Sequence, residues 1–166
     1  MATWPAGDIE VNGLRLHYTR TGGARPPVVL AHGVTDDGLC WTPVAEALAP
    51  EYDLIMVDAR GHGRSDAPER GYGPAEQAGD LAGAIAALGL RRPAVLGHSM
   101  GAATALALAG TRPEVPGAIV EPSLWRLPRS FARAGFVGRA SIRMGRNRGA
   151  HAVAVASARK ARTTAR

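Results

Sequence analysis

One pentapeptide of this chain has the composition of a nucleophilic site: Gly97-His98-Ser99-Met100-Gly101. An apolar run precedes it and an Ala-rich run follows it, which predicts that Ser99 lies on a turn from a strand to a helix. Small residues on both sides let the backbone turn tightly, and such a turn lifts the hydroxyl clear of the sheet. The first N–H groups of the helix would favour negative charge that develops beside them. We therefore expect Ser99 to be a nucleophile.

Two other short segments follow predicted buried strands and combine histidine, glycine and charged residues. They are residues 31–34 (AHGV), which contain His32 and Gly33, and residues 58–66 (DARGHGRSD). With the serine motif they resemble, in order and spacing, the α/β-hydrolase fold family in its esterase-like branch, over about residues 8–124. The resemblance implies hydrolysis of an ester, lactone or similar acyl bond through an acyl-serine intermediate. It implies a small-molecule acyl substrate and no cofactor or metal.

The resemblance also assigns roles to individual backbone groups and side chains. The N–H groups of Val34 and Met100 would bind the oxyanion of the tetrahedral intermediate. An ordinary loop position is the alternative for Val34. His32 and His62 would shape their loops rather than move protons, and His98 would pack beside the nucleophile.

A serine nucleophile needs a base, and the base needs an acid that orients it. In the family these residues follow one another as serine, acid and histidine. After Ser99 the acids are Glu114 and Glu121, and the only histidine is His151. A triad of Ser99, Glu121 and His151 can be assembled in the right order. Two alternatives stay open, namely that Glu121 is a loop carboxylate beside Pro122 and that His151 is a solvated histidine.

The elements that must position these residues are predicted from hydrophobic periodicity. A hairpin over residues 8–18, turning at Asn12-Gly13, opens the chain. Strands are expected at residues 28–31, 54–57, 94–97 and 117–121, and helices at residues 41–49, 74–88 and 100–110. Because the strands after the hairpin are short and apolar on both faces, the sequence predicts an α/β fold. We expect a mostly parallel sheet with helices on both faces.

Charge divides the chain into two parts. All 14 acidic residues lie at or before Glu121, and residues 1–124 carry a net charge of −5. Residues 125–166 contain ten arginines, one lysine and no acid, which gives +11, and they are rich in Ala and Gly. We therefore expect a partial α/β-hydrolase domain over residues 1–124 and an irregular basic tail over residues 125–166.

Three explanations of this tail stay open. It is a basic arm that binds nucleic acid or an acidic partner, a divergent end of a working hydrolase, or translation of a GC-rich gene in a shifted reading frame. We favour the third, because family-like sequence changes abruptly to Arg, Ala and Gly. Nucleic-acid binding is disfavoured, since interleaved aromatics and a binding motif are missing.

The favoured explanation of the tail also sets the functional expectation. The chain then ends after the sixth family strand, without the cap and the catalytic histidine, and its hydrolase activity is impaired. The alternative function is a non-catalytic fragment or a basic-tailed binding protein.

The single cysteine, Cys40, excludes an internal disulfide and fits a reducing compartment. The N-terminus has no secretory pattern, and no apolar run reaches membrane-spanning length, so we expect a cytoplasmic protein. Cys40 and Trp41 are expected to pack in the core near the first helix. The acidic pair Asp36-Asp37 is interpreted as a solvated loop rather than a metal site. The sequence carries no signal for an oligomeric state.

Overall fold

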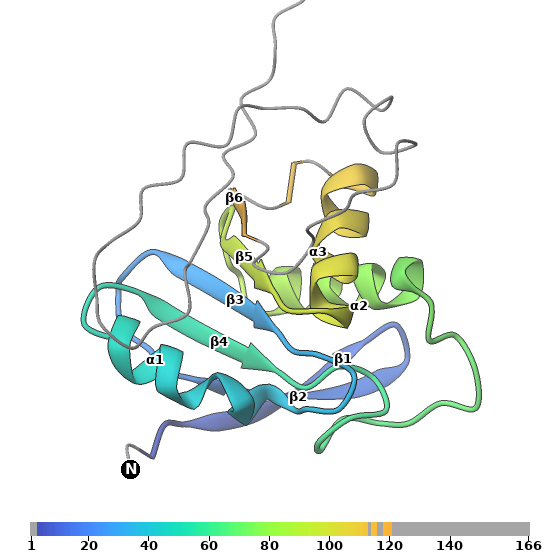
Figure 1. The fold of residues 1–166 in the computed structure, drawn as a ribbon, viewed down its shortest axis with the longest axis horizontal. Helices are drawn as coiled ribbons and strands as arrows, with labels where there is room; N and C mark the ends of the chain where they lie inside the picture. The colour runs from blue at the N-terminus through green and yellow to red at the C-terminus, as the bar shows by residue number, and fades with distance from the viewer. Residues whose placement is uncertain (1–2, 113, 116–117, 121–166) are drawn as a thin grey trace, which may run out of the picture.

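The computed structural model describes residues 3–112, 114–115 and 118–120. Within them, six strands form one sheet with the order β1-β2-β4-β3-β5-β6 (Figure 1). The strands are β1 (Ala6–Val11), β2 (Leu14–Arg20), β3 (Pro27–Ala31), β4 (Asp53–Val57), β5 (Ala94–Gly97) and β6 (Ala118–Val120). The helices are the 3₁₀ turn η1 (Gly38–Trp41) and the α-helices α1 (Thr42–Leu48), α2 (Pro74–Ala87) and α3 (Met100–Thr111).

The sheet is mixed, with antiparallel strands at one end and parallel strands from β4 to the edge strand β6. The hairpin β1–β2 is antiparallel, and β2 pairs antiparallel with β4. The strands β4, β3, β5 and β6 are parallel neighbours. Asn12 and Gly13 turn the hairpin with φ of 53° and 76°, the conformation that an Asn-Gly hairpin turn needs. The predicted α/β fold is therefore confirmed.

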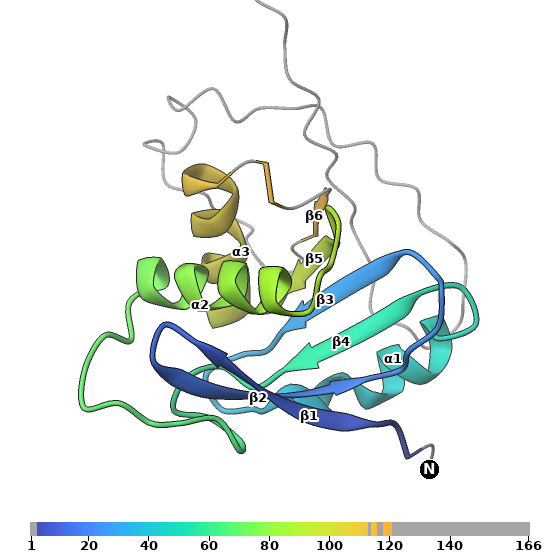
Figure 2. The same ribbon diagram turned by 180° about the vertical axis from the view of Figure 1, so that it is seen from behind.

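Helices cover both faces of the sheet, α1 on one side and α2 with α3 on the other (Figures 1 and 2). Side chains alternate along each strand, so Val29 and Ile55 pack against α2 and α3, whereas Leu30 and Met56 pack on the face that α1 covers. All four are almost fully buried. This two-sided burial explains why consecutive residues inside β3 and β4 are apolar.

The predicted first helix begins with a tighter turn than expected. Residues Gly38–Trp41 form the 3₁₀ turn, whose start is capped by the Asp37 carboxylate accepting from the Leu39 N–H. Trp41 is buried, as predicted, but Cys40 is exposed, so its predicted core position is wrong. With three residues per turn, adjacent residues point in different directions, and of Cys40 and Trp41 only Trp41 packs against the sheet.

Candidate active site

Ser99 lies between β5 and α3 in a backbone conformation that side chains rarely adopt. Its φ is 52° and its ψ is −111°, and the residue is exposed. A β-carbon at Gly97 would overlap the backbone of Gly101, and one at Gly101 would overlap the carbonyl of Ala31. Only glycine fits at both positions, and this close packing holds the strained turn in place.

Hydrogen bonds join this turn to the end of β3. The His98 N–H donates to the Ala31 carbonyl at 3.0 Å, and the Gly101 N–H donates to the His32 carbonyl at 3.0 Å. The carboxyl ends of β3, β4 and β5 lie at one edge of the sheet, because these strands are parallel. The motifs at residues 31–34 and 97–101 therefore meet there, as ligand-binding loops of open α/β sheets do.

Val34 stands in a tight turn over residues 33–36, in which the Asp36 N–H donates to the Gly33 carbonyl at 3.2 Å. Its side chain is exposed. Within the described residues, no protein acceptor bonds to the N–H of Val34 or to that of Met100, the first residue of α3. Two backbone donors are thus present on the two loops that the sequence analysis paired.

The His32 side chain is buried and has a partner at each ring nitrogen. Its Nε2 accepts a hydrogen bond of 3.0 Å from the Ala59 N–H, so the ring proton sits on Nδ1, which donates to the Gly33 carbonyl at 2.7 Å. Desolvation by burial lowers the pKa of His32, and the ring is therefore neutral at pH 7. The ring links the loop after β3 to the loop after β4.

His98, the histidine of the serine motif, is exposed. Its Nδ1 lies 3.0 Å from the point where a β-carbon on Gly33 would stand, so the ring covers that glycine. The turn that holds Ser99 at the surface therefore places His98 against the loop after β3.

Asp58, the residue after β4, connects the loop after β3 to the loop after β4. Its Oδ1 accepts from the Gly38 N–H at 2.7 Å and its Oδ2 from the Arg64 N–H at 2.8 Å. A β-carbon at Gly63, whose φ is 52°, would overlap the Asp58 carboxylate. The residue types at positions 58 and 63 are therefore required by loop structure.

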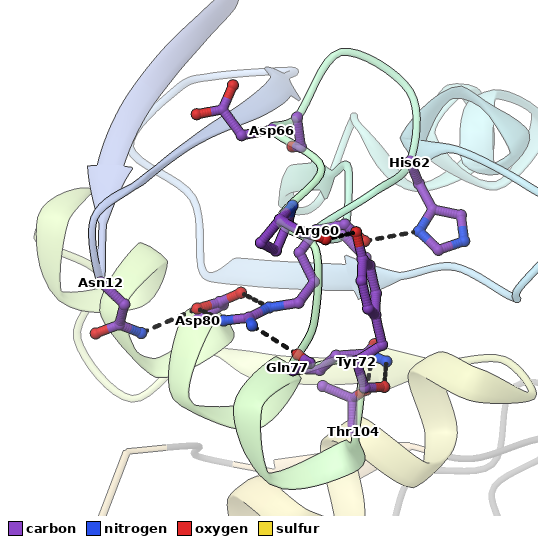
Figure 3. A network of polar contacts seen from close by, with 12 residues as sticks. Asn12, Arg60, His62, Asp66, Tyr72, Gln77, Asp80 and Thr104 are labelled. Atoms are coloured by element: carbon purple, nitrogen blue, oxygen red, sulfur yellow. Dashed lines mark hydrogen bonds and ion pairs between the residues drawn. The ribbon is translucent and has the colours of Figure 1, made fainter.

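A buried ion pair lies behind this loop (Figure 3). The Arg60 guanidinium donates to both carboxylate oxygens of Asp80 in α2, at 2.6 and 2.7 Å, and to the Gly71 carbonyl at 2.6 Å. Asp80 also accepts from the Asn12 side chain in the hairpin turn at 2.9 Å. The hydrogen bonds that Arg60 donates to the Asp80 carboxylate raise the pKa of Arg60. One carboxylate thus connects the hairpin, the loop after β4 and α2.

Sequence reasoning missed the role of Asp80, and it also missed a polar contact between α2 and α3. The Thr104 hydroxyl of α3 lies 3.2 Å from Gln77 Oε1 of α2, and the Gln77 amide donates to the Tyr72 carbonyl at 2.9 Å (Figure 3). Both side chains are buried. Each predicted helix carries a polar residue on its apolar face. Because buried polar groups need hydrogen-bond partners, these residues could have indicated a contact inside the protein.

Cys40 is the rival nucleophile by residue type. Partial desolvation of the thiol, together with the carboxylates of Asp36, Asp37 and Asp58, raises the pKa of Cys40 to about 11. The thiol is therefore protonated at neutral pH, and a thiol is a poor nucleophile. The two proposed triad partners, Glu121 and His151, lie outside the described residues.

A family model described as the alpha/beta hydrolase fold matches residues 26–162, which is most of the chain. The chain belongs to the α/β-hydrolase fold family. The predicted resemblance is thereby confirmed. The match extends past residue 124, and the predicted division at that position stays a prediction.

Several curated relatives of this chain are named for hydrolytic reactions. It is 41% identical over 108 residues to N-formylmaleamate deformylase from Pseudomonas putida, covering 64% of this chain and 40% of that protein. It is 39% identical over 110 residues to an epoxide hydrolase from Caballeronia sordidicola, covering 64% and 33%. The chain thus spans less than half the length of these relatives.

Solved structures give the same family fold. The enol-lactonase from Burkholderia xenovorans LB400 superposes with a TM-score of 0.65 at 33% identity, covering 68% of this chain and 45% of that one.

In the part of this hydrolase-family chain that the structure describes, no helix has the length and apolar character needed to cross a membrane.

Proposed function

We propose that this chain is a serine hydrolase that acts on an ester, lactone or similar acyl bond of a small molecule. The observation that supports this most is the strained backbone of Ser99, at φ 52° between β5 and α3. The hydroxyl oxygen attacks the substrate carbonyl and the leaving group departs, which gives an acyl-serine. Water then cleaves this ester and restores the hydroxyl.

The proposed oxyanion donors are the N–H groups of Val34 and Met100. In a trans peptide the carbonyl and the N–H point in opposite directions, so a held Gly33 carbonyl orients the Val34 N–H. That carbonyl accepts from His32 Nδ1 at 2.7 Å and from the Asp36 N–H at 3.2 Å. A preorganised donor of this kind is worth about 3–4 kcal/mol in the transition state.

The nucleophile's chemistry favours acyl substrates over epoxides, although both classes occur among the relatives. A serine oxygen that opens an epoxide ends in an ether, which has no carbonyl for water to attack. A serine oxygen that attacks an acyl carbonyl ends in an ester, which water can hydrolyse. The deformylase and the enol-lactonase are named for reactions of acyl bonds.

His151 is the proposed general base, with Glu121 as the acid that orients it. Without a working base, only catalysis by the oxyanion donors and substrate binding remains, well below that of an intact triad. We propose that this pair activates Ser99 poorly and that the enzyme is therefore slow, in keeping with the sequence-based expectation. The proposed compartment is the cytoplasm, where the one exposed thiol stays reduced.

A fluorophosphonate probe tests the nucleophile, because it labels only an activated serine. We expect the full chain and a Cys40→Ala control to be labelled, and Ser99→Ala to stay unlabelled by mass spectrometry. Hydrolysis of p-nitrophenyl acetate should follow the same pattern. Loss of labelling in His151→Ala would identify the base. An unlabelled wild-type chain, or equal labelling of Ser99→Ala, would refute the proposal.

A further inference from the structure

The His62 ring reaches from the loop after β4 to the turn that carries Val34. Its Nε2 lies 3.0 Å from the Val34 carbonyl oxygen, and its Nδ1 lies 2.9 Å from the Arg60 carbonyl oxygen. Figure 3 shows the ring beside the backbone of its own loop, in contact with the Arg60 carbonyl. Thus a single side chain, 28 positions along the chain from Val34, contacts the turn that supplies a proposed oxyanion donor.

Both partners of His62 are carbonyl oxygens, which only accept hydrogen bonds, so a hydrogen bond at either ring nitrogen has the ring as its donor. His32 does not compete for these contacts, because its own two nitrogens are bonded to Gly33 and Ala59. The two rings pack edge to face with centroids 5.1 Å apart.

Val34 joins two peptide planes, and each plane is held by a different histidine. His32 holds the Gly33 carbonyl, which belongs to the same plane as the Val34 N–H. His62 holds the Val34 carbonyl, which belongs to the next plane. The Val34 side chain is 62% exposed, so packing contributes little to its orientation. Rotation about Val34 is therefore restrained by these two contacts together with the hydrogen bond from the Asp36 N–H to the Gly33 carbonyl.

We propose that His62 is a positioning residue for the reaction, which limits rotation about Val34 by holding the Val34 carbonyl and so steadies the Val34 N–H that the Gly33 peptide orients. The inference rests on the proposed function, in which that N–H binds the oxyanion. The ring acts through the backbone of Val34, and it neither touches substrate nor moves a proton.

The kinetic test compares His62→Phe with His62→Gln in the full chain. Phenylalanine keeps a ring beside His32 but donates nothing, whereas glutamine keeps one donor. We expect kcat for p-nitrophenyl acetate to fall about tenfold in His62→Phe with KM unchanged, because an oxyanion contact stabilises the transition state. His62→Gln should recover part of the loss. His17→Phe, at a histidine that contacts Asp8 in the hairpin, is the matched control and should keep the wild-type kcat.

A second readout reports the turn itself and does not need activity. The Asp36 N–H bonds to the Gly33 carbonyl, so its hydrogen exchange measures opening of the turn over residues 33–36. His62→Phe should speed this exchange several-fold and leave the Gly38 N–H, held by Asp58, unchanged. Unchanged Asp36 exchange, or an unchanged kcat in an active wild type, would overturn the inference. If wild type shows neither labelling nor hydrolysis, the proposed function fails and the exchange result alone decides the role of His62.

Discussion

At the scale of single residues, the two glycines that flank Ser99 carry the geometry of the site. Gly97 is needed because the end of β5 meets the backbone of α3 without room for a side chain, and Gly101 is needed because α3 meets the end of β3 in the same way. The strained φ of Ser99 is tolerated since hydrogen bonds to Ala31 and His32 hold the turn on both sides. Substitution of these glycines should therefore affect folding before it affects chemistry.

A pair of alanine substitutions within α3 tests this requirement. Gly101→Ala should lower the free energy of unfolding by at least about 2 kcal/mol, because its β-carbon would overlap the Ala31 carbonyl. Gly110→Ala, in the same helix with open space around it, should raise stability by about 0.5–1 kcal/mol. Urea unfolding of both variants measures the difference, and a neutral Gly101→Ala would contradict the close packing described here.

At the scale of elements, polar side chains connect the loops and helices at the edge of the sheet where the carboxyl ends of β3, β4 and β5 lie. Asp58 joins the loops after β3 and β4, and the Arg60–Asp80 pair joins the second of these loops to α2. Asn12 extends that network to the hairpin. The side chains of Arg60 and Asp80 are almost fully buried, so each depends on the other for compensation of its charge.

Two arginine substitutions separate this buried pair from a surface pair. Arg60→Ala should cost about 3–5 kcal/mol of stability, because it leaves the Asp80 carboxylate buried without its cation. Arg15→Ala removes a pair with Asp66 in which both side chains are about two-fifths exposed, and it should cost less than about 1 kcal/mol. Chemical denaturation measures both values. Equal losses would show that burial does not distinguish the two pairs.

At the scale of the whole molecule, the central sheet buries a neutral histidine between two loops. Desolvation lowers the pKa of His32 in the folded state, while the unfolded chain has a histidine of ordinary pKa, about 6.5. Below that pH, His32 binds a proton more readily in the unfolded state than in the folded state. Folding stability is therefore complete above about pH 6.5 and falls as the pH drops toward the folded-state pKa of His32.

The pH dependence of unfolding tests this linkage. From pH 7 to pH 5 the free energy of unfolding should fall, with a contribution from this one proton of at most about 1.4 kcal/mol per pH unit. His32→Asn, which keeps a donor and an acceptor but does not titrate, should show a shallower slope over the same range. Parallel curves for the two proteins would assign the acid sensitivity to other groups.

The sequence by itself determined the features that depend on neighbouring residues. Alternation and turn residues fixed the hairpin at Asn12-Gly13, and apolar runs fixed the parallel strands to within a few residues. The strand–turn–helix around Ser99 is equally local, because two glycines within five positions decide it. These predictions were confirmed since each depends on periods and φ preferences that a short segment contains.

The tertiary structure alone decided which distant groups meet. Composition could not choose Asp80 as the partner of Arg60, nor the Val34 carbonyl as the partner of His62, because both choices depend on how the loops after parallel strands converge. The tertiary structure also exposes the Cys40 side chain and buries that of Trp41, although the two residues are adjacent in sequence. Burial and pairing are properties of the assembled sheet, whereas periodicity describes only each element.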